Sequence, residues 1–231
     1  MFQTTAKDTS RKGCRDVWNA FMAEGARYSE NDIPCCPTTM EIPPLRMITY
    51  EEALKSDDYE ATVVFYKDDY KFDGIKSGIW AEPKKCIRVL SKFKGGVITP
   101  DFAMNQDLPE PWKIFNVYRK QVFGFYFVKN GLKVCNNVRW GTEETWRYCF
   151  DGIDRGSMVA ISTLGCLKNP VNRRRYAEGL DQMVQRLEPP IILVYGSCPE
   201  DIFEKHKRTG IQIIAYDSEI QRKMKGVTAD V

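Results

Sequence analysis

Polar side chains that could do chemistry occur at the ends of several short apolar segments of the chain. Asp101 lies in the turn TPDF, and Asp73 lies in the charged turn DDYKFDG. Asn137 and Arg139 alternate along a third segment, so a strand there would direct both side chains to one face. In such a pocket Arg139 would bind an anion, while Asp101 or Asp73 would hold a ribose, a base or a metal ion. A buried Asp–Arg ion pair that only stabilises the fold is the alternative.

Two further groups of residues would complete this pocket. Asn116 and Arg119 are three residues apart on an expected helix, so they share one face of it and would approach the pocket from the side. Thr163 follows another apolar segment and would lie at the same edge. Trp140 directly follows Arg139, where an aromatic ring can stack on a base.

The turn Tyr195-Gly196-Ser197 lies between the apolar run IILV and an expected helix. The free amide groups at the start of a helix favour a bound phosphate, which makes these three residues candidates for ligand binding. Pro199 removes one amide, however, and Ser197 equally fits an N-cap position. This turn is therefore expected to form one wall of the site and not its centre.

Several common types of site are excluded by their missing motifs. The chain has neither a GxxxxGK[S/T] loop nor a GxGxxG fingerprint, and it has no CxxC pair. Its single histidine, His206, lies in the charged segment KHKR and is expected at the surface. We therefore expect neither a zinc site nor a histidine-based triad, we assign no residue to a metal, and the sequence indicates no particular cofactor.

The densest basic patch is the run Asn172-Arg173-Arg174-Arg175. It has two interpretations, a solvated helix start or a contact with nucleic-acid phosphate, in which Trp140, Trp146 and Tyr148 would offer stacking. The net charge of +3 comes from 34 basic and 31 acidic residues, so no global field would recruit nucleic acid.

These residues require a scaffold that gathers strand ends at one edge. Segments beginning near residues 62, 97, 132, 158, 191 and 211 predict strands, with helices between most successive pairs. This alternation of strands and helices predicts an α/β fold with a mostly parallel sheet and flanking helices. A Rossmann-like, doubly wound open sheet is the first expectation, and a small or partial β/α barrel is the alternative.

The chain is expected to form one α/β domain, residues 61–231, preceded by an irregular extension, residues 1–60, that packs on it. The segment SENDIPCCPTTMEIPP in this extension holds four prolines and is therefore expected as an extended strap. No apolar run approaches the roughly 20 residues of a membrane span, and the first residues lack the apolar centre of a secretory signal. A cytoplasmic protein without a membrane partner is expected.

Much of the chain from Thr62 onward resembles a family known as domain of unknown function 4417, on the segments YKDDYKFDG, GVITPDF, NVYRKQVFG, NNVRWGTEETWRYCFDGI, VAISTLGCLKN and VYGSCPEDIF. The strap NDIPCCPTTMEIP is similar to that family as well. The matching signature positions are Asp73, Thr99, Asp101, Asn116, Arg119, Asn137, Arg139, Trp140, Asp151, Gly165, Tyr195 and Gly196. The resemblance implies a phage or mobile-element protein of Firmicutes, where replication, DNA processing and evasion of host defence are common tasks.

Two functional hypotheses follow. In the first, the chain binds a nucleotide-like or nucleic-acid phosphate ligand at the strand ends, with hydrolytic or DNA-processing activity if Asp101 and Asp73 act as catalytic residues. In the second, it is a non-catalytic interaction protein that binds a host or phage protein, for instance an inhibitor of a host anti-phage defence enzyme, through the strap and exposed aromatic residues.

Overall fold

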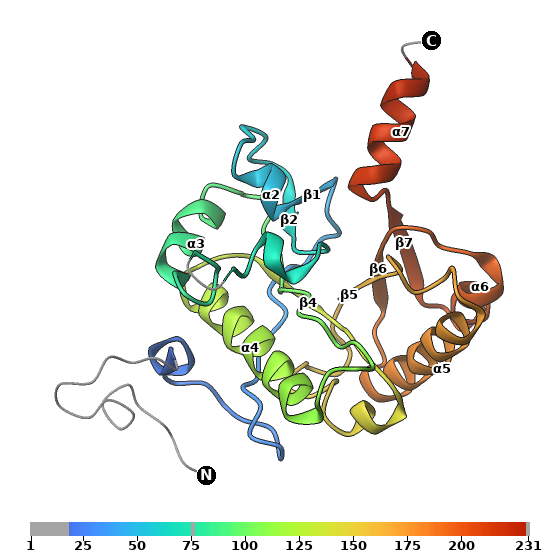
Figure 1. Ribbon diagram of the computed structural model, residues 1–231, viewed down its shortest axis with the longest axis horizontal. Helices are drawn as coiled ribbons and strands as arrows, with labels where there is room; N and C mark the ends of the chain where they lie inside the picture. The colour runs from blue at the N-terminus through green and yellow to red at the C-terminus, as the bar shows by residue number, and fades with distance from the viewer. Residues whose placement is uncertain (1–18, 75–76, 230–231) are drawn as a thin grey trace.

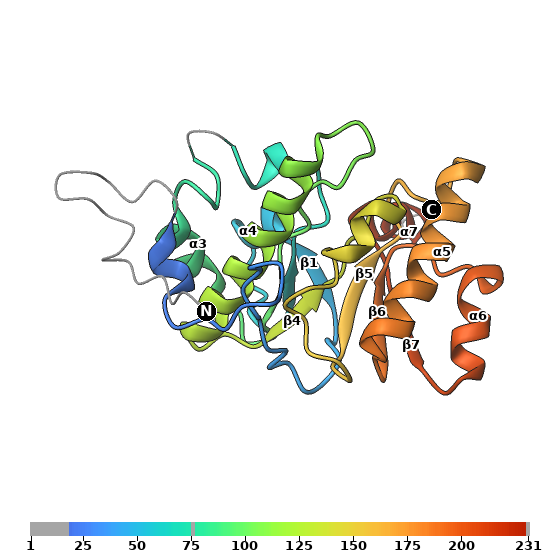
Figure 2. The same ribbon diagram turned by 90° about the horizontal axis from the view of Figure 1, so that it is seen from below.

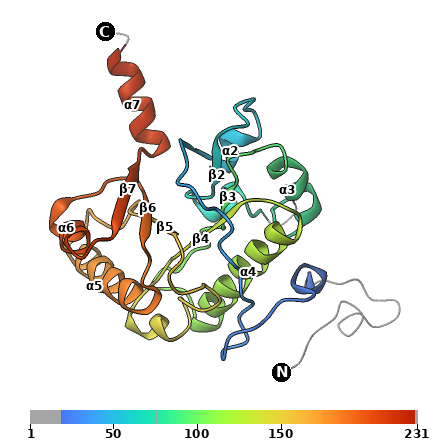
Figure 3. The ribbon, with the colours of Figure 1, turned by 180° about the vertical axis from the view of Figure 1, so that it is seen from behind.

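The computed structural model describes residues 19–74 and 77–229, and its centre is a sheet of seven parallel strands. The strands are β1 (Met47–Thr49), β2 (Thr62–Val64), β3 (Val97–Ile98), β4 (Val134–Asn137), β5 (Val159–Ser162), β6 (Ile191–Tyr195) and β7 (Gln212–Tyr216). Each strand pairs with the next one along the chain. The ribbon follows an arc with most of its helices on the outer side (Figures 1 and 3).

The predicted α/β fold with a parallel sheet is confirmed, and it takes the form of a partial β/α barrel. A doubly wound sheet needs a point where the strand order reverses, and here the order β1 to β7 does not reverse. Because successive right-handed crossovers all advance in one direction, their helices fall on one face and the sheet curls away from them. The doubly wound expectation is thereby corrected.

The six helices of the described chain are α2 (Tyr50–Ala53), α3 (Pro83–Leu90), α4 (Glu110–Lys129), α5 (Pro170–Leu187), α6 (Glu200–Arg208) and α7 (Glu219–Ala229). Three short 3-10 helices are η1 (Ala20–Ala23), η2 (Asp69–Lys71) and η3 (Glu143–Arg147). Thr49 caps α2 in a capping box with Glu52, and the side chain of Asn169 caps α5. Figure 2 shows α5 and α6 beside β5, β6 and β7.

Each central strand is buried on both faces, which explains its continuous apolar sequence. In β6, Ile192 and Val194 pack outward in the cluster formed with α5 and α6, while Leu193 and Tyr195 pack inward. The inner cluster includes the small Ala160 of β5, since the concave side of a curled sheet offers less room.

The strap closes the end of the half-barrel where β4 begins. The backbone amides of Thr39 and Met40 donate to the carbonyl of Val134, at 2.8 and 3.0 Å, and Met40 is buried in the inner cluster. The Asn136 amide donates to the carbonyl of Cys36 at 2.8 Å. The irregular strap thus supplies backbone hydrogen bonds and an apolar plug.

Strand β1 was not among the expected strands and lies within the expected N-terminal extension. It has three residues and follows a proline-rich segment, so it carries little periodic signal. The two edge strands, β1 and β7, are joined by side chains: the Tyr216 hydroxyl donates to the Pro44 carbonyl at 2.8 Å, and Arg222 of α7 binds Glu52 at 2.7 Å. The rest of α7 projects from the body (Figure 1). Over the described ranges, no helix combines the length and apolarity needed to cross a membrane.

His206 is buried, which corrects its expected surface position. It lies on the face of α6 that carries Ile202 and Phe203 and packs toward α5, and its Nε2 is 3.0 Å from the Oδ1 of Asp181. Burial lowers the pKa of His206, and the nearby Asp181 carboxylate opposes this.

Candidate functional site

The carboxyl ends of β3 and β4 bring Asp101, Asn137 and Arg139 together. The Asn137 amide donates to one oxygen of Asp101 at 2.8 Å, and an Arg139 nitrogen lies 3.4 Å from the other oxygen. The Tyr66 hydroxyl donates to the Asn137 amide oxygen at 3.2 Å and so fixes the orientation of that amide. The expected common face of Asn137 and Arg139 is confirmed by these contacts. The Asp101 carboxylate raises the pKa of Arg139.

Asp73, Arg119 and Asn116 form a second hydrogen-bonded group. Arg119 contacts Asp73 at 2.5 Å and donates to the Asn116 oxygen at 2.7 Å. Asp73 also accepts from the Trp80 amide at 3.0 Å, and the guanidinium lies 3.9 Å from the ring centre of Phe102. Because these charges are paired with each other and buried, this group anchors the loop after β2 on α4.

Asp69 lies near charged residues of both groups, and the sequence-based site did not include it. Its carboxylate accepts the Ala103 amide at 3.1 and 3.2 Å. Burial raises the pKa of Asp69, and the nearby Asp101 and Asp73 raise it further, while Arg119 lowers it. The sequence indicated Asp69 only by its position in the segment DDY, a few residues after β2.

A cavity of about 500 Å³ opens beside Arg139 at this edge of the sheet. Of the predicted site residues, only Arg139 and Trp140 line it. The other lining residues follow β2, β3, β4 and β5 or lie on α5, and they are Asp68, Met104, Asn105, Gln106, Gly141, Thr142, Leu164, Gly165, Cys166, Asn172, Arg175 and Tyr176. Sites in β/α barrels form at this end of the strands, where several loops meet.

Two guanidinium groups from different elements line this cavity. Arg139 comes from the end of β4, and Arg175 comes from the first turns of α5. Arg175 donates to the amide oxygen of Gln106 and has no ion pair with a carboxylate of the described ranges. The neighbouring arginines of the basic run are paired, Arg173 with Asp201 at 2.6 Å and Arg174 with Glu178 at 3.7 Å.

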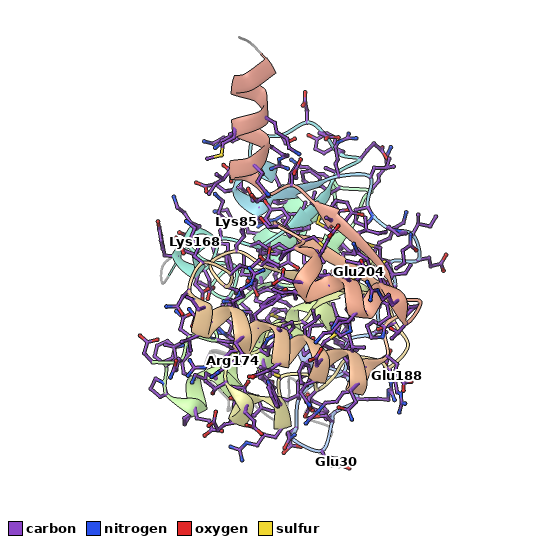
Figure 4. All side chains as sticks on the ribbon, turned by 90° about the vertical axis from the view of Figure 1, so that its right-hand side faces the viewer. Glu30, Lys85, Lys168, Arg174, Glu188 and Glu204 are labelled. Atoms are coloured by element: carbon purple, nitrogen blue, oxygen red, sulfur yellow. The ribbon has the colours of Figure 1, made fainter. Side chains whose placement is uncertain are left out.

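The basic run of α5 was therefore the sequence signal for the missed residues Arg175 and Tyr176. One interpretation of that run was a solvated helix start, and Arg174 fits it. Figure 4 shows Arg174 near one end of α5 and Glu188 at the other end. The loop after β4 packs on α5 and so brings Arg139 and Arg175 to the same cavity, which sequence spacing alone does not indicate.

An aromatic pair forms one wall of the cavity. The rings of Trp140 and Tyr176 lie 5.1 Å apart, and both side chains are largely buried. The Tyr176 hydroxyl is buried without a hydrogen-bond partner, and burial raises its pKa well above the usual range. A buried hydroxyl without a partner is unfavourable, and a ligand atom would relieve this.

The turn after β6 is held by contacts within the protein and does not line the cavity. The Thr163 hydroxyl donates to the Ser197 carbonyl at 2.8 Å, and the Tyr195 hydroxyl accepts the Glu219 amide at 2.9 Å. Gly196 has a φ of +111°, and a Cβ there would lie 2.7 Å from the Thr163 hydroxyl oxygen. Helix α6 begins at Glu200 after Pro199, so the N-cap role considered for Ser197 is wrong.

The donor set does not fit a metal ion. In the ranges 19–74 and 77–229 no three His, Cys, Asp or Glu side chains are grouped closely enough to hold one. Asp101 and Asp73 each contact an arginine instead, which favours anion chemistry at this edge.

Comparisons with known proteins identify relatives over most of the chain. The model of the family described as domain of unknown function (DUF4417) matches residues 26–217. The Gene 1 protein of Mycobacterium phage L5 is 32% identical over 207 residues, which cover 82% of this chain and 84% of the relative. The Gene 1 protein of Mycobacterium phage D29 is 32% identical over 167 residues, 68% of this chain and 60% of that protein's length. No solved structure matches the chain. The relatives are mycobacteriophage proteins, so the expected Firmicutes origin stays a prediction.

Proposed function

Because the chain belongs to the DUF4417 family, a family of unknown function, we propose a function from the cavity itself: it binds a nucleotide-like or nucleic-acid phosphate group between Arg139 and Arg175. The observation that carries this proposal is the convergence of two guanidinium groups from separate elements on one cavity. Guanidinium groups bind phosphate through paired hydrogen bonds. Asp101 offsets the charge of Arg139 but not that of Arg175, so a phosphate would neutralise the positive charge that remains.

The size and the lining of the cavity support a small phosphorylated ligand. Its volume of about 500 Å³ lies within the range of small-molecule sites, roughly 300 to 1,000 Å³. Trp140 and Tyr176 offer an apolar wall for a base or a sugar, and Asn172 offers an amide. The exposed Asp68, which also lines the cavity, would favour a hydroxyl donor of the ligand.

A hydrolytic or DNA-processing step at this site would use Asp101 or Asp69 as its acid or base. Asp73 is held by Arg119 and Trp80, and we therefore assign it to positioning. Asp101 does not line the cavity itself but contacts Arg139, so its carboxylate is one side chain away from the proposed phosphate position. Substitution of Asp101 by Asn would then abolish turnover of a bound nucleotide without weakening its binding, because it removes a negative charge beside Arg139.

Thermal-shift titration with nucleoside monophosphates and inorganic phosphate tests the binding proposal. The native chain should be stabilised by roughly 5 to 10 °C at a ligand concentration of about 100 times Kd. Arg139→Ala and Arg175→Ala should each lose most of this shift. Arg174→Ala is the matched control, because Arg174 lies next to Arg175 but pairs with Glu178. Equal shifts in all four proteins would contradict the proposal, and so would no shift in any of them.

A second candidate, a non-catalytic interaction protein, is favoured by one feature of the strap and the residue that directly follows it. Ile42 and Leu45 have exposed fractions of 77% and 86%, unusual for large apolar side chains close together in sequence. Ile42→Ser combined with Leu45→Ser would remove this surface without touching the buried Met40. Loss of a co-purifying host protein in this variant, with the same protein retained by Arg139→Ala, would favour the interaction role.

A further inference from the structure

Lys120 places an ammonium group inside the protein without a hydrogen-bond partner. The residue lies on α4 with an exposed fraction of 3%, and its Nζ atom is buried and unpartnered. Burying an unpaired charge is among the most unfavourable arrangements in a folded protein. Another buried lysine of the same helix, Lys113, donates to the Gln106 carbonyl at 3.1 Å. Of these two buried lysines of α4, only Lys113 therefore has a hydrogen-bond partner.

The Lys120 side chain lies behind the proposed phosphate site. It lines a second cavity of about 10 Å³ together with Phe102, Met104, Asn116, Val117 and Arg139. Met104 and Arg139 also line the large cavity, so the two cavities share a wall. The small cavity has room for about one water molecule, and a nucleotide would not reach the amine.

We propose that Lys120 is a positioning residue of the anion site, whose buried ammonium offsets the carboxylate of Asp101 and so leaves the charge of Arg139 available to a phosphate. This inference rests on the proposed function. It also explains why a buried ammonium is kept where no hydrogen bond compensates for it: its charge acts on Asp101 and Arg139 through space.

The charge balance at this edge supports the role of Lys120. Three carboxylates, Asp69, Asp73 and Asp101, lie near two guanidinium groups, those of Arg119 and Arg139. A protonated Lys120 balances this set, and a neutral Lys120 leaves it negative. A negative charge behind Arg139 would weaken the binding of a phosphate dianion.

The protonation of Lys120 changes within an accessible pH range. Burial lowers the pKa of Lys120 to about 8, and the groups that oppose this effect are Cys149, Asp101, Cys36 and Asp151. Burial raises the pKa of both the Cys36 and Cys149 thiols to about 12, so these two groups stay neutral through this range. Arg139 faces the same small cavity and keeps its charge.

The test measures the Kd of deoxyadenosine monophosphate by titration calorimetry between pH 7 and 9.5. The second pKa of a phosphate monoester is about 6, so the ligand keeps a constant charge over this range. For the native chain we expect roughly tenfold weaker binding at pH 9.5 than at pH 7. Lys120→Met should bind weakly at both values, and Lys120→Arg should bind tightly at both. Lys113→Met, the control, should keep the native pH profile.

The possible failures are distinguishable. A native Kd that does not change with pH, or a Lys120→Met variant with the native profile, would overturn the role of Lys120 and leave the phosphate site intact. Absence of binding by the native chain at pH 7 would instead overturn the proposed function. Circular dichroism of each variant would show that it is folded, and the apolar Met at position 120 is expected to be tolerated.

Discussion

Lys120 and Lys113 are two buried amines of one helix, and we expect their substitution to have different effects on stability. In the native state burial holds the pKa of Lys120 at about 8, while its value in the unfolded chain is the ordinary one, about 10.4. Between these values the unfolded chain binds more protons than the folded chain, so native stability rises with pH. Below pH 8 the full unfavourable effect of the buried charge is present.

Lys120→Met should therefore stabilise the protein at pH 7, by up to about 3 kcal/mol in the free energy of unfolding. This gain should shrink as the pH rises toward 10, where the native lysine is already neutral in the folded state. Urea denaturation of both proteins at pH 7 and pH 9.5 measures the difference. Lys113→Met should instead destabilise by about 1 kcal/mol at both values, since it loses a hydrogen bond. A Lys120→Met variant that is less stable than the native chain at pH 7 would contradict this interpretation.

The sequence predicted part of the site at the level of single residues. Strand alternation was sufficient to place Asn137 and Arg139 together, because it depends only on local geometry. It could not distinguish the roles of Asp101 and Asp73, because both are aspartates in turns. Their roles differ because Asp101 contacts Arg139 and Asp73 contacts Arg119. Burial of Lys120 was not predictable from the sequence either. The apolar residues of α4 surround most of the helix, so its sequence does not show which polar residues face the interior.

Helix α5 determines the shape of the cavity through one close contact with the loop after β4. A Cβ at Gly179 would lie 2.1 Å from the Trp140 indole nitrogen, so only glycine lets this ring pack on the helix. Gly179→Ala should destabilise the protein by about 1 to 3 kcal/mol despite the better helix propensity of alanine. It should also weaken nucleotide binding, because displaced Trp140 would move the adjacent Arg139.

The adjacent variant Glu178→Ala is the control for Gly179→Ala, since this exposed residue makes only a 3.7 Å ion pair with Arg174. Thermal denaturation and tryptophan fluorescence would report the two effects. If Gly179→Ala matched Glu178→Ala in stability and spectrum, the packing of Trp140 on α5 would not be a structural requirement.

Most elements were predictable because their signals are local. The run IILV marked β6, and the helix expected to carry Asn116 and Arg119 is α4. Strand β1 was missed because its three residues are positioned by pairing with β2, a tertiary contact. The segment after Thr142 forms the 3-10 helix η3, and no side-chain hydrogen bond caps it.

Closure of the sheet is a property of the whole molecule, and the alternation of strands and helices could not predict it. The sheet remains open between β1 and β7, and side chains rather than a strand ladder connect these edges. Arg222 binds Glu52 and also donates to the Met47 carbonyl of β1. The hydroxyl of Tyr216 adds one hydrogen bond to Pro44.

Arg222→Met should therefore loosen β1 without affecting the centre of the sheet. We expect faster hydrogen exchange for the amides of β1, while those of β5 and β6, which are fully paired and buried, should keep their protection. Tyr216→Phe should have a smaller effect, about 1 kcal/mol in the free energy of unfolding. Uniformly faster exchange in all strands would indicate that Arg222 stabilises the whole fold and not this edge.

Phosphate bound in the cavity beside Arg139 and Arg175 would be seen directly in a crystal structure with deoxyadenosine monophosphate. We expect density for the phosphate within hydrogen-bond distance of both guanidinium groups and for the base or sugar against Trp140 and Tyr176. Nucleotide bound elsewhere on the protein, or a cavity without nucleotide at a saturating concentration, would contradict this expectation.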